Sequence, residues 1–248
     1  MINNRKLENL INKKLKSKNY KDQIFNGLQI EGQSQIKKII TGVTASKKLI
    51  NIAIKKKAQA IIVHHGYFWN NKKIIIDKIT KNRLRLIFSK NINLYCWHLP
   101  LDLHKKLGNN TQLGKKLNII IKGKISSYVW WGILKKKISG IKFCKKIFDK
   151  FNRKPLYIHD NIKSKIKKIG WCSGKGQKFI DQAIKFGVDA YLTGEVSEET
   201  THSAIESKIH FFSIGHHASE IGGIKSLSKW IKKKVQINIE FINIPNPV

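Results

Sequence analysis

The segment that begins at Lys38 recurs 130 residues further along the chain, and this repeat restricts the folds open to the sequence. The string KIITGVTASKKLINIAIKKKAQAIIVHH aligns with KIGWCSGKGQKFIDQAIKFGVDAYLTGE, which begins at Lys168. Each copy reads as an apolar strand, a turn, an amphipathic helix and a second apolar strand. Strands that are apolar almost throughout and are joined by helices indicate parallel βαβ units.

Each copy continues into a further helix and a third strand. Helical stretches at 83–90 and 199–207 precede the strands INLYCW, which ends at Trp97, and IHFFSIG, which ends at Gly215. The sequence therefore predicts an α/β protein whose two halves are tandem βαβαβ units.

We divide the chain into a first α/β half at 1–124 and a second at 125–248, and we allow the C-terminal strand to pack back on the first half. The region at about 119–165 reads as a strand, a turn at Trp130 and Trp131, a helix and the strand PLYIHD. The N-terminal residues read as a helix whose apolar face is formed by Leu7, Leu10, Ile11 and Leu15.

Histidines and carboxylates gather where the predicted strands end. In open α/β sheets, ligands bind at the carboxyl ends of parallel strands. Five of the nine histidines follow such strands, which makes imidazole the main donor expected there. The residues at these ends are His64, His65, His98, Asp102, Thr193, Gly194, Glu195, His216, His217 and Glu220. Imidazole and carboxylate groups bind divalent metals such as zinc, iron and manganese, so the set favours a metal site.

Each of these residues also has a structural explanation when taken alone. A single His after a strand is usually a solvated or capping loop residue, and adjacent histidines on a strand point to opposite faces. We interpret Glu198 and Glu199 as charges favoured at a helix N-terminus. The metal hypothesis rests instead on recurrence, because both halves carry an HH pair and a His followed four residues later by a carboxylate.

Two further motifs are weaker. The turn at Ser173–Gly176 resembles a phosphate-binding loop but lacks the Walker spacing. The aromatic residues Tyr67, Phe68 and Trp69 fit a packing ledge or a pocket wall better than a platform for stacking bases.

The net charge of +34 comes almost entirely from lysine, with 45 Lys against 4 Arg. Nucleic-acid readers favour Arg for its bidentate geometry, and the lysines are spread along the whole chain together with 42 isoleucines. We interpret this excess as a compositional bias that produces a solvated basic surface. Specific nucleic-acid binding is not expected, although anionic small molecules would still be attracted.

The sequence favours a cytoplasmic protein. Apolar stretches fall short of the ~20 residues that a membrane helix needs, and the N-terminus lacks the apolar block of a secretory signal. The three cysteines (Cys96, Cys144 and Cys172) are widely spaced, which argues against a disulfide framework or a CxxC zinc site.

Several segments together resemble one known family, the NIF-three-like family, also catalogued as GTP cyclohydrolase I type 2. In chain order they are NGLQIEG, TGVTAS, IIVHHGYFW, WHLPLDLHKKLGNN, WCSGKGQ, GVDAYLTGEVSEETTHSA, GHHASEIGG and IPNP. The resemblance covers essentially the whole chain. It implies two interlinked α/β domains, a dinuclear metal site in the cleft between them and a ring-shaped homohexamer.

The resemblance also implies roles for individual residues. It assigns the metal ligands to His64, His65, Asp102, His216 and Glu220, with Glu220 bridging two ions, and it places His98 and Glu195 against the site. All of these residues are present in the chain. We expect two divalent ions per chain, of iron, zinc or manganese.

The leading hypothesis is a metal-dependent hydrolase that acts on a purine nucleotide-like substrate. Divalent ions acidify water and so provide a hydroxide nucleophile near neutral pH, which for GTP would attack the imidazole carbon of guanine. We expect Glu195 or His98 to relay protons and His217 to orient a ligand or the substrate. The alternatives are a metal-binding scaffold or adaptor ring with little turnover, a phosphoester hydrolase, and a nucleic-acid-binding ring.

Overall fold

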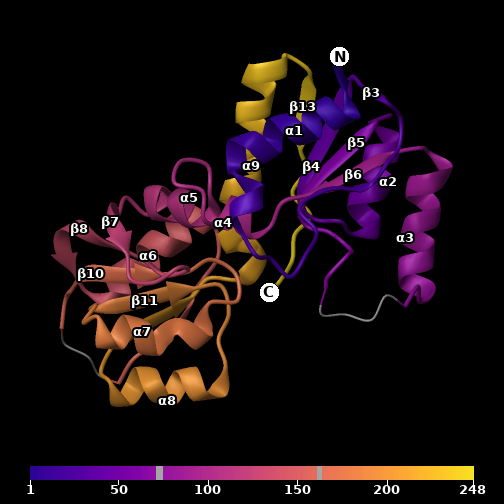
Figure 1. Cartoon of the computed structure of the whole chain (residues 1–248). Coiled ribbons are helices and arrows are strands. Elements are labelled where there is room, and N and C mark those ends of the chain that lie inside the picture. The colour runs from indigo at the N-terminus through magenta and orange to yellow at the C-terminus, as the bar shows by residue number, and fades with distance from the viewer. Residues whose placement is uncertain (71–74, 161–163) are drawn as a thin grey trace. The chain divides into compact units, whose positions relative to one another are not determined.

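The computed structural model describes residues 1–70, 75–160 and 164–248. The chain divides into two compact units (Figure 1). Unit 1 comprises Met1–Gly108 and Gly223–Ile244, and unit 2 comprises Asn109–Gly222 and Pro245–Val248.

Unit 1 contains the first copy of the repeat. Its elements are β1 (Ile2–Asn3), α1 (Asn4–Leu15), the 3-10 turn η1 (Ser17–Asn19), β2 (Gly27–Ile30), β3 (Gln35–Ile36), β4 (Lys38–Thr44), α2 (Lys47–Lys55), β5 (Ala60–His65), α3 (Lys78–Ser89), β6 (Asn93–Cys96), α4 (Leu99–Asp102), most of α9 (His216–Val235) and β13 (Asn238–Phe241). The described residues form a five-stranded sheet in the order β13-β4-β5-β6-β2, besides a small β1-β3 pair. Strands β4, β5 and β6 are parallel, as the repeat predicts, and β13 joins them by pairing in parallel with β4.

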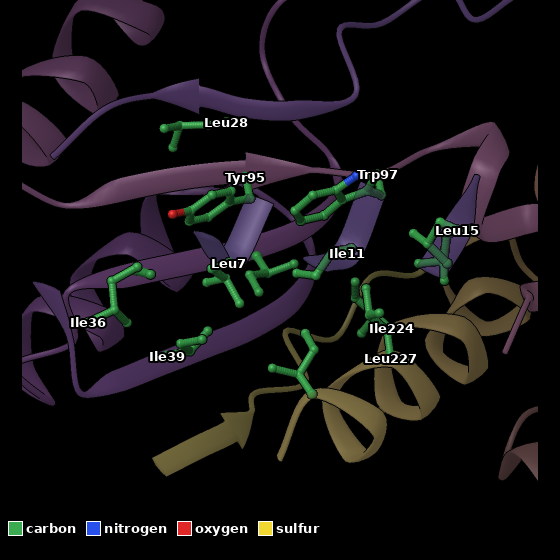
Figure 2. Close-up of a cluster of buried hydrophobic side chains, with 14 of the residues drawn as sticks. Leu7, Ile11, Leu15, Leu28, Ile36, Ile39, Tyr95, Trp97, Ile224 and Leu227 are labelled. Carbon is green, nitrogen blue, oxygen red and sulfur yellow. The ribbon is translucent and has the colours of Figure 1, made fainter. Parts of the chain in front are cut away.

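The sheet of unit 1 is covered by helices on both faces. Successive residues of β4 point to opposite sides, so Ile39 packs with α1 and α9 whereas Ile40 packs with α2 and α3. Figure 2 shows the first of these cores, in which Leu7 of α1 lies near Tyr95 of β6. Burial of both faces explains why these strands are apolar throughout rather than alternating.

Unit 2 contains the second copy. Its elements are α5 (Asn109–Lys116), β7 (Ile120–Lys124), β8 (Trp130–Ile138), α6 (Gly140–Phe151), β9 (Leu156–Ile158), β10 (Ile166–Trp171), the 3-10 turn η2 (Gln177–Phe179), α7 (Ile180–Lys185), β11 (Ala190–Thr193), α8 (Glu198–Glu206), β12 (His210–Ser213) and the first residues of α9. Its described sheet has six strands in the order β7-β8-β10-β11-β12-β9, and β10, β11 and β12 are parallel. Helices α5 and α6 pack on one face, and α7 and α8 on the other.

The strand register is conserved between the two copies. Ile39 of β4 lies opposite Ala60 of β5, and Ile169 of β10 lies opposite Ala190 of β11. Both members of the second pair are 130 residues after those of the first. The internal repeat seen in the sequence is thus a repeat of backbone pairing, and the predicted α/β fold class is confirmed.

The units differ from the two halves drawn from the sequence. Residues 109–124 belong to unit 2, because α5 and β7 pack with the second sheet, and residues 223–244 return to unit 1. The return occurs because one face of α9 is buried against the first sheet and β13 extends that sheet. Hydrophobic pattern alone does not indicate which sheet a distant helix will cover.

The expected turn at Trp130 and Trp131 is wrong. These residues open β8, which pairs with β7 on one side and β10 on the other. A Cβ atom at Gly132 would clash with the Ile120 carbonyl oxygen, so this glycine permits close strand approach rather than marking a turn.

Within the described residues, helices fall short of the combined length and apolar character required to cross a bilayer. Cys96 and Cys144 are free thiols.

Candidate metal centre

His64 is the most buried imidazole at the carboxyl edge of the first sheet. It lies near the end of β5, with its side chain fully buried. Its Nδ1 lies 2.9 Å from the Trp97 carbonyl oxygen, which can only accept, so Nδ1 carries the hydrogen. The other nitrogen, Nε2, lies 3.3 Å from the Asp102 Oδ1. His64 therefore presents its Nε2 directly to a carboxylate.

Two more histidines lie beside His64. The ring centroids of His64 and His65 are 4.7 Å apart, and those of His64 and His98 are 5.0 Å apart. One potential ligand nitrogen from each of the three rings falls within 4.8 Å of the others. Adjacent side chains on a strand normally point to opposite faces, but His64 and His65 stay close together because His65 is the last residue of β5.

His98 is held by a residue that the sequence reasoning missed. Asp22 accepts a hydrogen bond from the His98 Nδ1 at 2.9 Å, and it also accepts the Leu99 N–H at 2.8 Å. Burial works to raise the pKa of Asp22, but the hydrogen bond and the charge of His98 outweigh it and hold that pKa below its usual value. Asp22 is 76 residues from His98 in the sequence and lies just before the NGLQIEG segment. A single carboxylate at that position does not by itself indicate contact with a histidine.

Unit 2 builds a similar arrangement around His216, the first residue of α9. The Nδ1 of His216 lies 2.6 Å from the Glu195 Oε1, and its Nε2 lies 3.2 Å from the Glu220 Oε2. Burial works to lower the pKa of His216, but the two carboxylates outweigh burial and raise that pKa to about 9. Glu195, expected as a proton relay, thus lies against the Nδ1 of His216, whereas Glu220 faces the other ring nitrogen, Nε2.

The loop at Ser173–Gly176 supports this second cluster instead of cradling a phosphate. The Ser173 N–H bonds to the Asn110 Oδ1, the Gly174 N–H to the Ser219 Oγ, and the Gly176 N–H to the Thr193 Oγ1. Three of its backbone donors are therefore committed to side chains of the same chain. The phosphate-loop interpretation is not supported by this geometry.

The other residues singled out from the sequence lie against the hydrophobic core or at the first turns of helices. Tyr67, Phe68 and Trp69 pack against the core on the α2 and α3 face, and Trp69 meets His98 edge to face at 5.2 Å. They form the expected packing ledge. Glu198 and Glu199 open α8, as predicted. His217 follows His216 on α9, and its backbone N–H donates to the Val248 carbonyl oxygen.

The donor set of both clusters fits a divalent metal ion. His64 and His216 each keep Nδ1 on an oxygen acceptor and aim Nε2 at a carboxylate oxygen. When Nε2 lacks its proton, it and the carboxylate are both acceptors, and a bound cation would satisfy both of them. Imidazole nitrogen and carboxylate oxygen suit zinc, iron or manganese. Buried His, Asp and Glu groups able to hold metal ions are thus present in the chain.

Comparison with known proteins identifies the family. A family model described as Duf34/NIF3 (NGG1p interacting factor 3) matches residues 2–247. The chain belongs to the DUF34/NIF3 family. The resemblance drawn from the sequence motifs is therefore confirmed.

Members of this family match the chain over its full length. A GTP cyclohydrolase 1 type 2 homolog of Buchnera aphidicola subsp. Schizaphis graminum is 57% identical over 241 residues, or 97% of this chain and 98% of the relative. A solved structure described as protein ybgI of unknown function has a TM-score of 0.98 and 47% identity, covering 100% of both chains. TTHA1606 from Thermus thermophilus has a TM-score of 0.88 over 100% of both chains at 24% identity, which supports the fold.

Proposed function

We propose that this chain is a metal-dependent hydrolase that acts on a purine nucleotide-like substrate. The observation that carries the proposal is the paired imidazole–carboxylate geometry of His64 with Asp102 and of His216 with Glu220. Such pairs, with Nδ1 fixed and Nε2 aimed at a carboxylate, are typical of metal-ligating histidines. The names of the relatives support a nucleotide as the substrate class.

The proposed ligands are His64, His65, Asp102, His216 and Glu220. They are proposed to hold two divalent ions per chain. When bound, such ions supply Lewis-acid chemistry, polarising substrate oxygens and acidifying water.

The chain's own residues take complementary roles. His98 can accept a proton at Nε2, because its Nδ1 is committed to Asp22. Glu195 stabilises the protonated Nδ1 of His216 and so directs Nε2 toward the ligand position. We propose that His217 orients a ligand or the substrate. Lysine side chains would attract the phosphates, given the net charge of +34.

The family resemblance supports a homohexameric ring as the assembly that carries this site. Light scattering coupled to size-exclusion chromatography measures the mass directly. A mass six times 28.6 kDa is expected, and a monomer at micromolar concentration would contradict it.

Metal analysis tests the ligand assignment. His64→Ala and His216→Ala remove ligands from different units, yet both are expected to lower the metal content of the purified protein. Asp149→Asn, which changes an exposed carboxylate on α6, is the matched control and should keep full occupancy. Full occupancy in the His64→Ala, His216→Ala double variant would refute the assignment. Glu220→Gln should reduce both ions if this carboxylate bridges them.

A hydrolysis panel of purine nucleotides tests the activity. Turnover by the metal-loaded protein should exceed that of free metal and should fall when a chelator is added. Glu195→Gln should retain most of the metal and lower turnover. Absence of turnover at full metal occupancy would favour the scaffold or adaptor function instead, and release of phosphate without ring opening would favour a phosphoester hydrolase.

A further inference from the structure

We propose that Asp22 is the positioning residue of His98, holding its ring as the Nδ1–H tautomer so that Nε2 is the reactive nitrogen. Asp22 lies between η1 and β2, remote in sequence from the histidine cluster. The role of His98 in chemistry rests on the proposed function, whereas the tautomer does not depend on it.

The contacts of Asp22 require an ionised carboxylate. Its side chain is 2% exposed. Oδ1 accepts from His98 Nδ1 at 2.9 Å and from the Gln23 N–H at 2.7 Å. Oδ2 accepts from the Leu99 N–H at 2.8 Å and from the Asn26 side-chain amide at 2.9 Å. With four donors around its two oxygens, this carboxylate has no place for a proton of its own.

The orientation of the Asn26 amide is fixed independently. Its Oδ1 lies 2.7 Å from the His98 backbone nitrogen, a group that can only donate. The other end of the amide, Nδ2, is therefore the NH₂ group that faces Asp22. Asn26 and Asp22 together hold both the backbone and the ring of His98.

The tautomer of His98 follows from these contacts. Because the Asp22 Oδ1 only accepts, the His98 Nδ1 must carry the hydrogen that it receives. In the neutral ring, Nε2 then holds the lone pair. This nitrogen belongs to the ring that lies 5.0 Å from His64 and 5.8 Å from His65.

Replacement of Asp22 by Asn should invert the tautomer. The Oδ2 side of Asp22 meets two fixed donors, the Leu99 N–H and the Asn26 NH₂. The Oδ1 side meets one fixed donor, the Gln23 N–H, and the His98 ring, which can move its hydrogen. The oxygen of the new amide should therefore take the Oδ2 side. Its own NH₂ then faces His98, which can adapt by moving its hydrogen to Nε2. The variant thus keeps the side-chain shape and removes the lone pair from the nitrogen that Asp22 normally exposes.

The first experiment reads the tautomer in the metal-free full chain. Long-range ¹H–¹⁵N correlation spectra distinguish protonated from unprotonated ring nitrogens, and His98→Gln assigns the His98 signals by their loss. We expect the wild-type ring as Nδ1–H and the Asp22→Asn ring as Nε2–H. A wild-type Nε2–H ring overturns the proposal even if the variant does not fold. An Nδ1–H ring in folded Asp22→Asn overturns it as well.

The second experiment measures Zn²⁺ binding by calorimetry. His98 can also offer Nε2 to an ion beside His64 and His65, because one nitrogen from each of the three rings lies within 4.8 Å of the others. Asp22→Asn should therefore weaken binding about 10–100-fold, whereas Asp149→Asn on the exposed face of α6 should not. When His98 is already replaced by Gln, the added Asp22→Asn substitution should weaken Zn²⁺ binding by less than a further twofold. A full additional loss in that background would show that Asp22 acts on the fold rather than through His98, and would overturn the proposal.

The two proposals fail separately. Zn²⁺ binding and nucleotide turnover with an Nε2–H ring in the wild type would leave the function intact and refute the positioning role. The expected tautomers without turnover would refute the hydrolase and retain Asp22 as the residue that sets the His98 ring.

Discussion

Three imidazoles of the candidate metal centre each have their orientation set by the group on Nδ1. The Trp97 carbonyl holds His64, Asp22 holds His98, and Glu195 holds His216. The acceptor on Nδ1 keeps the hydrogen on that nitrogen and leaves Nε2 as the second nitrogen of the ring. Histidines that look alike in the sequence therefore differ in the group that sets their tautomer.

Proton competition at His216 should make metal affinity depend on pH. The two carboxylates raise the pKa of His216 to about 9, so the metal-free ring is protonated at neutral pH. A metal must displace that proton from Nε2. Affinity should therefore rise about tenfold per pH unit toward pH 9 and level off above it.

Titration of metal-free protein with Mn²⁺ between pH 7 and pH 9 measures this slope. Glu195→Gln removes one of the charges that raise the pKa of His216, so its plateau should begin at lower pH. An affinity that stays constant across this range in the wild type would contradict the expectation.

A second histidine, His210, should govern the acid stability of unit 2. Burial lowers its pKa, and its two ring nitrogens contact the Tyr157 hydroxyl at 2.7 Å and the Ser164 carbonyl at 3.1 Å. Nε2 donates to the carbonyl, so Nδ1 accepts from Tyr157 in the neutral ring. His159, which lies nearby, also opposes a positive charge on His210, whereas Asp189 favours it.

The sign of the pH effect follows from the lowered pKa. The unfolded chain binds the proton more readily than the folded one, so stability from the neutral ring is present above about pH 6.5 and is lost as the pH falls below it. Tyr157→Phe should cost about 1–3 kcal/mol at pH 7.5, because the buried Nδ1 loses its donor. Urea unfolding at pH 7.5 and 5.5 measures both effects, and His202→Gln, an exposed histidine on α8, should leave them unchanged.

At the scale of elements, the turn after a parallel strand affects where the proposed ligands lie. After β10, Gly174 adopts a φ of +64° and lies against Glu220, the carboxylate of α9 that faces His216. A side chain at this position would enter the space of the Glu220 Oε1. The loop conformation and the ligand position are therefore coupled.

Gly174→Ala should consequently lower metal occupancy by displacing Glu220. The control is Gly187→Ala, since Gly187 has a φ of +71° with open space around it. Both variants should lose about 1–2 kcal/mol from the left-handed backbone, but only Gly174→Ala should lose metal. Equal metal content in the two variants, measured by elemental analysis, would argue against this coupling.

At the scale of the whole molecule, the charge of +34 is the dominant long-range property. Several lysines cover aromatic rings, as Lys116 does with Phe151 at 4.0 Å from the ring centre. These contacts fit lysines that lie along apolar surface with their charges in water. The whole-chain distribution of lysine favours general attraction of anions over readout of a base sequence.

Binding to duplex DNA should accordingly be weak and indifferent to sequence. A protein held only by several phosphate contacts loses on the order of a thousandfold in affinity between about 50 and 200 mM salt. Fluorescence anisotropy with two unrelated duplexes should give equal affinities at low salt and little binding at physiological salt. Strong preference for one duplex at physiological salt would favour the nucleic-acid-binding ring.

The sequence by itself determined the repeated βαβαβ units and the edge of each sheet where histidines occur. It could do so because the hydrophobic period and the order of elements along the chain can be read from short stretches of sequence. The repeat at a shift of 130 residues also matches the strand pairing, since Ile39 pairs with Ala60 and Ile169 pairs with Ala190. The proposed ligands were likewise visible in the sequence, since they follow buried strands directly.

Only the tertiary structure decided which nitrogen each histidine presents and which residues stand behind it. Asp22 reaches His98 across 76 residues, and α9 leaves one unit to pack in the other. The sequence pattern around Trp130 was compatible with a turn until pairing on both sides placed it in β8. Hydrogen bonds between distant residues depend on how the buried faces pack together, and a one-dimensional pattern specifies that a face is buried without specifying what covers it.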